Sequence, residues 1–175
     1  KLKDLLEKEE SIKHSVPFGD RSGSVIEPYL TEQWFLNVKK LSKDALKVVK
    51  NKKTIFFPES WTKTYNLWLK DIKPWCISRQ IWWGHQIPIW YGDNGKIFAA
   101  ANENEAQKQA DRFYKKKNSY IKQDSNVLDT WFSSSLWPFA SLGWPYKTYN
   151  FKRFYKTSVL VTGFDILFFW VARMM

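Results

Sequence analysis

The stretch Val159-Leu-Val-Thr-Gly163-Phe-Asp165-Ile-Leu-Phe-Phe-Trp170 decides the expected fold. Its β-branched start predicts a buried strand over residues 158–162, which breaks at Gly163 and turns into a long apolar helix beginning near Asp165. A strand that ends at a glycine and passes into a helix is typical of open α/β sheets, which bind ligands outside the carboxyl ends of their strands. The stretch therefore predicts a binding site at Gly163.

The residues at this turn suit a nucleotide. Gly163 lets a ligand approach the backbone closely, and the Asp165 carboxylate can accept hydrogen bonds from ribose hydroxyls. Capping of the helix is the commoner use of such a carboxylate. Ile166 and Trp170 share one helix face, and they either line a small apolar pocket or face the ordinary core. Spacing leaves both alternatives open.

A second informative segment is Trp75-Cys-Ile-Ser-Arg-Gln-Ile-Trp-Trp-Gly-His-Gln-Ile-Pro-Ile-Trp-Tyr91, in which rings alternate with hydrogen-bonding side chains, as in a binding cleft. Cys76 is expected to be a buried structural thiol rather than a nucleophile with His85 as its base. The two histidines and the one cysteine lack the paired spacing of zinc ligands. We therefore predict neither a catalytic residue nor a structural metal in this chain.

The other predicted elements alternate between helices and strands. We expect a short strand at 24–26 between turns, a helix from Thr31 with Val38, Leu41, Ala45, Val48 and Val49 on one face, a strand at 54–57, a helix capped by Ser60, strands at 75–78 and 127–132, a hairpin around Gly92–Gly95, and a helix over 102–117. This alternation favours an α/β layer.

Composition narrows the class of partner. Lys and Arg number 28 against 17 acidic residues, giving a net charge of +11, and 18% of the residues are aromatic. Both features suit a nucleotide or RNA ligand, although a lysine-rich surface and large core rings would explain them equally well. A single cysteine suggests the cytoplasm, and no segment reads as a membrane span. The chain starts without Met in a helical pattern and ends inside another, which we interpret as an internal fragment.

Three motifs connect the chain to a known family: residues 75–91, residues 127–145 (Val-Leu-Asp-Thr-Trp-Phe-Ser-Ser-Ser-Leu-Trp-Pro-Phe-Ala-Ser-Leu-Gly-Trp-Pro) and residues 159–175. In order and spacing they resemble the class I aminoacyl-tRNA synthetases of the valine, isoleucine and leucine group, and within it the valyl-tRNA synthetases. With residues 25–35 the resemblance covers almost the whole chain.

The resemblance implies a domain organisation. Residues 1–74 would be the end of the editing insertion and its helical and β-ribbon stalk. Residues 75–175 would be the second half of the catalytic nucleotide-binding domain, a partial Rossmann-type parallel sheet. The His-Ile-Gly-His-type and Lys-Met-Ser-Lys-Ser motifs are absent, so this piece alone is expected to be inactive.

The resemblance also implies an activity and a site. ATP, with Mg²⁺, would activate L-valine to valyl-adenylate, and the valine would pass to its tRNA; the whole enzyme would be a monomer that edits mischarged threonine. Gly163 and Asp165 would hold the adenylate, and Trp83, Ile166 and Trp170 would wall the valine pocket. Arg79 is the candidate for a tRNA contact.

Two other interpretations stay open. An isoleucyl enzyme is the weaker choice, because Gly-Ser-Asp followed by Gln-His would be expected where this chain has Gly163-Phe-Asp. A non-catalytic nucleic-acid-binding module would use Trp82, Trp83 and Trp90 as a stacking surface. Convergence of Trp83 and Trp170 beside Gly163 would favour the enzyme, whereas a flat exposed aromatic face would favour the module.

Overall fold

A computed structural model describes residues 8–175, and they fall into two units, Lys1–Glu32 and Gln33–Met175. The described part of the first unit is a small ribbon. Phe18 and Val25 form an antiparallel bridge, supported by hydrogen bonds from Gly19 N to Ser24 O (2.9 Å) and from Ile26 N to Pro17 O (2.9 Å). The predicted turns around residues 24–26 are thus confirmed. Most of the helical pattern expected at the start of the chain lies outside the described residues.

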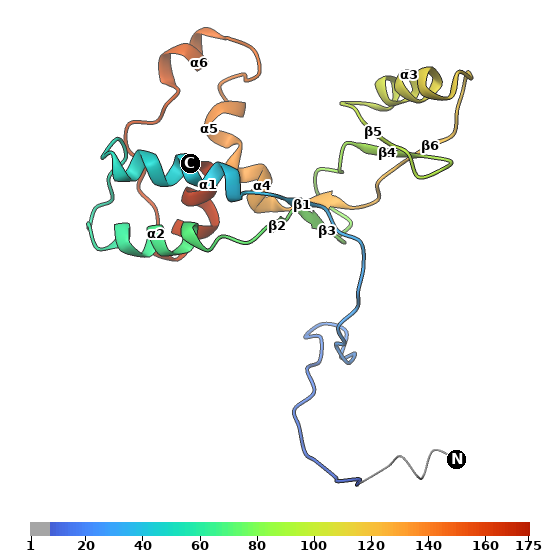
Figure 1. Cartoon of the computed structure of the whole chain (residues 1–175), viewed down its shortest axis with the longest axis horizontal. Helices are drawn as coiled ribbons and strands as arrows, with labels where there is room; N and C mark the ends of the chain where they lie inside the picture. Colours follow the sequence, from blue (N-terminus) through green and yellow to red (C-terminus); the bar gives the residue numbers. More distant parts are fainter. Residues whose placement is uncertain (1–7) are drawn as a thin grey trace. The chain divides into compact units, whose positions relative to one another are not determined.

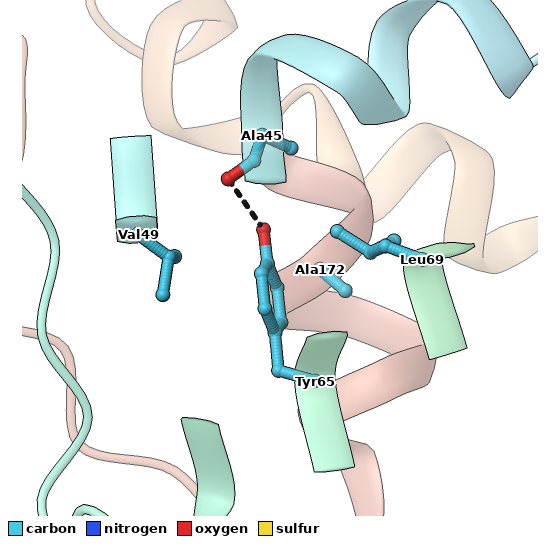
Figure 2. Close-up of a cluster of buried hydrophobic side chains, with 5 residues drawn as sticks. All are labelled: Ala45, Val49, Tyr65, Leu69 and Ala172. Atoms are coloured by element: carbon cyan, nitrogen blue, oxygen red, sulfur yellow. Dashed lines mark hydrogen bonds between the residues drawn. The ribbon is translucent and has the colours of Figure 1, made fainter. Parts of the chain in front are cut away.

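The second unit contains a helical core built by α1 (Lys39–Lys50) and α2 (Trp61–Lys70), which contact each other (Figure 1). Ala45 and Val49 of α1 pack with Tyr65 and Leu69 of α2, and Ala172 joins them from the end of the chain. The Tyr65 hydroxyl donates a hydrogen bond to the Ala45 carbonyl (3.2 Å), as Figure 2 shows. Burial raises the pKa of Tyr65 well above its usual value.

Several predictions for this region are wrong in detail. The first helix begins at Lys39 rather than Thr31, because Phe35–Leu36 forms strand β1 instead. Leu41 was expected on the buried face of α1 but is exposed, whereas Ser42 is buried. The buried face of α1 is therefore narrower than the spacing of its apolar residues predicts. The expected strand at 54–57 is not formed. Helix α2 starts after Ser60 as predicted, but the Ser60 side chain makes no cap hydrogen bond.

Two short antiparallel ribbons follow. Strand β1 (Phe35–Leu36) pairs with β2 (Trp75–Cys76), and β3 (Ser78–Arg79) pairs with β7 (Val127–Leu128). The predicted strand at 127–132 ends at Leu128, because Asp129 caps a helix, α4 (Thr130–Ser135).

A sheet and a helix form from the contiguous residues 89–123. Strands β4 (Ile89–Gly92), β5 (Ile97–Ala99) and β6 (Ile121–Gln123) pair in the antiparallel order β5-β4-β6, and α3 (Glu103–Tyr114) packs on them. Their core consists of Trp90, Phe98, Ala106 and Ala110. The predicted hairpin and helix are both confirmed. We call these residues the 89–123 sheet unit.

The end of the chain departs most from expectation. After α5 (Trp137–Ala140) and α6 (Tyr149–Phe154), residues 158–162 form no strand, and Val161 is 90% exposed. The expected long helix is a 3-10 turn (Phe164–Ile166), a π-helix (Leu167–Val171) and a last turn, α7 (Ala172–Met174).

The predicted strand at 158–162 is therefore wrong for this structure. A strand exists only when a neighbour pairs with it, and no described segment does so. Every strand pair among residues 8–175 is antiparallel. The fold is mixed α/β with small antiparallel sheets, and the predicted Rossmann-type parallel sheet is not seen in it.

Candidate active site

The Gly163 turn is open to solvent at the position predicted for a ribose. Gly163 has ordinary backbone angles (φ −65°), but a Cβ atom there would lie 2.4 Å from Oδ1 of Asp165. The Asp165 side chain is exposed and does not cap the 3-10 turn. Within residues 8–175, no hydrogen bond or ion pair engages this carboxylate. The capping alternative is thus not realised in this structure.

Ile166 and Trp170 lie on the next turns, and both are half-buried. The Trp170 indole Nε1 donates a long hydrogen bond to the carbonyl of Ser134 in α4 (3.4 Å). The ring of Trp131, also in α4, lies 6.3 Å from the ring of Phe169. Helix α4 is therefore the element against which this turn packs.

Trp83 is placed differently from the other predicted pocket residues. Its side chain is 90% exposed, and it makes no ring contact with Trp170 within the part of the chain described. The loop at residues 80–85 is nonetheless anchored, because Gly84 has φ +153° and a Cβ there would lie 2.9 Å from Val127. The structure thus brings together Gly163, Asp165, Ile166 and Trp170 but not Trp83. Trp82 and Trp83 form an exposed pair instead.

Trp131 is a pocket candidate that the sequence prediction missed. Residues 127–132 are predicted as a strand, and Ser134 lies beyond its end, so the prediction does not place Trp131 and Ser134 on a common face. Recognising Asp129 as a helix cap would have placed these two residues, at i and i+3, on one face of α4.

Arg79, the candidate for a tRNA contact, is engaged within the protein. Its Nη2 forms an ion pair with the Asp129 carboxylate, and Nη1 donates to the carbonyls of Cys76 (3.0 Å) and Ser78 (2.7 Å). The side chain is only partly exposed. Contact with tRNA stays a prediction. Cys76 itself is half-buried rather than buried, and its Sγ lies 3.8 Å from Gln33 Oε1.

A buried carboxylate, Asp124, holds the junction between the ribbons and the 89–123 sheet unit. Its Oδ2 accepts hydrogen bonds from Trp34 Nε1 (2.9 Å) and the Tyr91 hydroxyl (2.8 Å), and its Oδ1 accepts one from Asn126 N (2.8 Å). Burial pushes the pKa of Asp124 upward, but these hydrogen bonds together outweigh it and leave the pKa below its usual value.

Residues 8–175 show neither a metal-binding cluster nor a membrane-spanning helix. No three His, Cys, Asp or Glu side chains gather in a way that could hold a metal ion. No helix in that range is long and apolar enough to cross a membrane.

Comparison with known proteins gives the family. The model of class I tRNA synthetases (I, L, M and V) matches residues 5–175. The chain is 62% identical to the valine–tRNA ligase of Pelagibacter ubique over 174 residues, which is 99% of this chain and 20% of that protein. It is 58% identical to the valine–tRNA ligase of Caulobacter vibrioides over 166 residues (95% of the chain, 18% of the relative) and 51% identical to that of Nitrobacter winogradskyi over 189 aligned positions (98% and 20%).

The chain thus spans about a fifth of the length of these relatives. The match extends over the Gly163 turn, α4 and the ribbons alike. Its identity to several valine–tRNA ligases is high over almost every residue. The chain belongs to the class I tRNA synthetases, as a segment of the valine–tRNA ligase type.

Proposed function

We propose that the longer protein containing this chain ligates L-valine to its tRNA through a valyl-adenylate made from ATP. The observation that carries the proposal is 51–62% identity to curated valine–tRNA ligases over nearly the whole chain. Because the chain spans only about a fifth of those proteins, the reaction is assigned to the whole enzyme and not to this segment alone.

The Gly163 turn is the proposed adenylate site. A ribose ring needs close backbone approach and a hydrogen-bond acceptor, which Gly163 and the unpartnered Asp165 carboxylate would supply. Substituting Gly163 by Ala would crowd Asp165, because the added Cβ would come within 2.4 Å of its Oδ1. We expect Gly163→Ala to raise the KM for ATP more than the KM for valine.

The valine side chain is proposed to lie against Ile166 and Trp170. Both are half-buried and follow the adenylate site directly in the chain. When the carboxylate of valine is activated at that site, the valine side chain would therefore lie against them. An apolar pocket of this kind excludes larger side chains, but it separates valine poorly from threonine, which is nearly isosteric. Removal of mischarged threonine by an editing domain of the whole protein is therefore part of the proposal.

The third wall of the pocket has two candidates. Trp83 was predicted for it, but the indole is exposed and away from ring contact with Trp170, whereas Trp131 lies beside Phe169. Trp83→Ala and Trp131→Ala variants of the full-length protein distinguish them. The variant that raises the valine KM, with the ATP KM unchanged, identifies the wall.

The remaining partners follow from the family and the charge. The net charge of +11 suits a tRNA ligand, and Arg79 stays the proposed contact. Mg²⁺ is proposed to arrive with the ATP phosphates; because residues 8–175 offer no acidic cluster, we assign none of their side chains to it. We propose that the whole protein is a cytoplasmic monomer. Its other segments would supply strands that pair with residues 158–162 in a parallel sheet.

The exposed Trp82 and Trp83 pair is what a stacking module for nucleic acid would need. That second candidate separates from the enzyme by one assay, valine-dependent ATP–pyrophosphate exchange by the full-length protein. The proposal predicts exchange with valine, weaker exchange with threonine and little with isoleucine, and none by the 175-residue chain alone. Absence of exchange with every amino acid, combined with retained RNA binding, would support the module.

A further inference from the structure

We propose that Asp129 is a positioning residue for the valine pocket, because its buried carboxylate both caps α4 and forms an ion pair with Arg79. The inference rests on the proposed function of the Gly163 turn. Asp129 touches neither ATP nor valine in this proposal. It acts through the elements that carry Trp131 and Trp170 and through the loop that carries Trp83.

The Asp129 carboxylate is buried, with the residue only 4% exposed, and both of its oxygens are used. Oδ1 caps α4 by accepting hydrogen bonds from Trp131 N (2.8 Å) and Phe132 N (3.1 Å). Oδ2 forms the ion pair with Arg79. A buried carboxylate with this many partners orients the helix that it caps, because any tilt of α4 would break either the cap or the ion pair.

Arg79 connects this carboxylate to the loop at residues 80–85, which begins immediately after it. Its Nη1 is fixed on the carbonyls of Cys76 and Ser78, so the guanidinium cannot follow Asp129 if the helix moves. Backbone hydrogen bonds join the same two segments: Asp129 N donates to Ile77 O (2.7 Å), and Leu128 N donates to His85 O (2.7 Å). The loop that carries the exposed Trp83 is therefore held by hydrogen bonds at both of its ends.

A second arginine, Arg173, packs among aromatic rings at the end of the chain. Arg173 lies over the ring of Trp75 (3.9 Å) and near those of Phe168 and Phe169 (both 5.5 Å). Burial lowers the pKa of Arg173, the charge of Asp129 raises it, and the charge of Arg79 lowers it further. The residues just before Arg173 include Trp170, whose indole is hydrogen-bonded to α4.

The test separates the charge of Asp129 from its capping role. Asp129→Asn keeps a side-chain oxygen that can cap α4 but removes the negative charge that pairs with Arg79. In the full-length protein we expect the valine KM in ATP–pyrophosphate exchange to rise roughly ten-fold or more, with the ATP KM changed by less than about two-fold. Discrimination between valine and threonine should fall in parallel.

Asp124→Asn is the matched control. Asp124 is about equally buried, and its carboxylate accepts three hydrogen bonds, but none of them comes from α4 or from residues 163–174. It should lower thermal stability without raising the valine KM. If Asp129→Asn does not fold, Arg79→Gln leaves the α4 cap in place and is expected to raise the valine KM as well.

The outcomes are distinct. A wild-type protein without valine-dependent exchange overturns the proposed function and this inference together. An active wild type, with a valine KM that Asp129→Asn or its substitute Arg79→Gln leaves unchanged, overturns the inference alone. A loss of thermal stability with unchanged KM values, as expected for Asp124→Asn, would likewise show that Asp129 only stabilises the fold.

Discussion

The 89–123 sheet unit and the last eighteen residues of the chain behave oppositely. The unit has its hairpin turn, helix cap and core within one contiguous segment, and its predicted elements are present. The end of the chain is more apolar, yet its predicted strand is absent and Val159 and Val161 are exposed. An element that needs only neighbours in sequence forms within this chain, whereas one that needs a distant strand does not.

The largest effect is expected from emptying the core of the sheet unit. Trp90 is buried between β5, β6 and α3, so Trp90→Ala should destabilise the unit by about 3–5 kcal/mol. Trp82→Ala, the same substitution at an exposed position nearby, should change stability by less than about 0.5 kcal/mol. Urea unfolding of the chain measures both. Equal losses of unfolding free energy in the two variants would mean that the buried core around Trp90 does not stabilise the sheet unit.

A smaller effect is expected where the end of the chain joins the helical core. Tyr65 packs with Ala172 and donates a hydrogen bond to Ala45 O, so Tyr65→Phe should cost about 1–2 kcal/mol. It should also alter the alkaline response. The pKa of Tyr65 is raised in the folded state, so its stabilisation is complete below the ordinary tyrosine pKa and declines as pH rises beyond it.

Thermal melts between neutral pH and pH 11 test this point. The wild type should lose stability above about pH 10, and Tyr65→Phe should lose less over the same interval. Parallel losses in the two proteins would mean that another group is responsible.

The smallest effects compare two predicted helix starts. Asn102 caps α3 by accepting from Glu105 N (3.0 Å), and Glu105 accepts in return from Ala101 N (3.2 Å), so Asn102→Ala should cost about 1 kcal/mol. Ser60 makes no such bond, and Ser60→Ala should be close to neutral. The denaturant midpoints of the two variants, each compared with the wild type, measure both effects. A larger loss at Ser60 would contradict the cap geometry described for α2.

The same contrast explains what the sequence could predict. The Gly92–Gly95 turn, the helical composition of residues 102–117 and the apolar spacing of α2 are local signals, and each predicts the right element. Residues 158–162 have strong β propensity, but propensity without a partner strand leaves an extended segment. Residues 127–132 failed for another reason: a short apolar run does not distinguish a strand from a capped helix.

The candidate site divides in the same way. Gly163, Asp165, Ile166 and Trp170 all lie between positions 163 and 170, so their proximity followed from the sequence alone. The placement of Trp83 and Trp131 relative to that turn depends on how α4 and the loop at residues 80–85 pack, which spacing does not encode. The ion pair of Arg79 with Asp129 joins residues fifty positions apart and had no local signal.

The most direct test of the account is the valine KM in ATP–pyrophosphate exchange for the full-length protein and its Trp170→Ala variant. A large apolar side chain in contact with substrate contributes about 2–3 kcal/mol, so the KM for valine should rise roughly 30- to 150-fold while the KM for ATP stays near its wild-type value. An unchanged valine KM in a folded Trp170→Ala protein would show that the turn after Gly163 does not form the valine pocket.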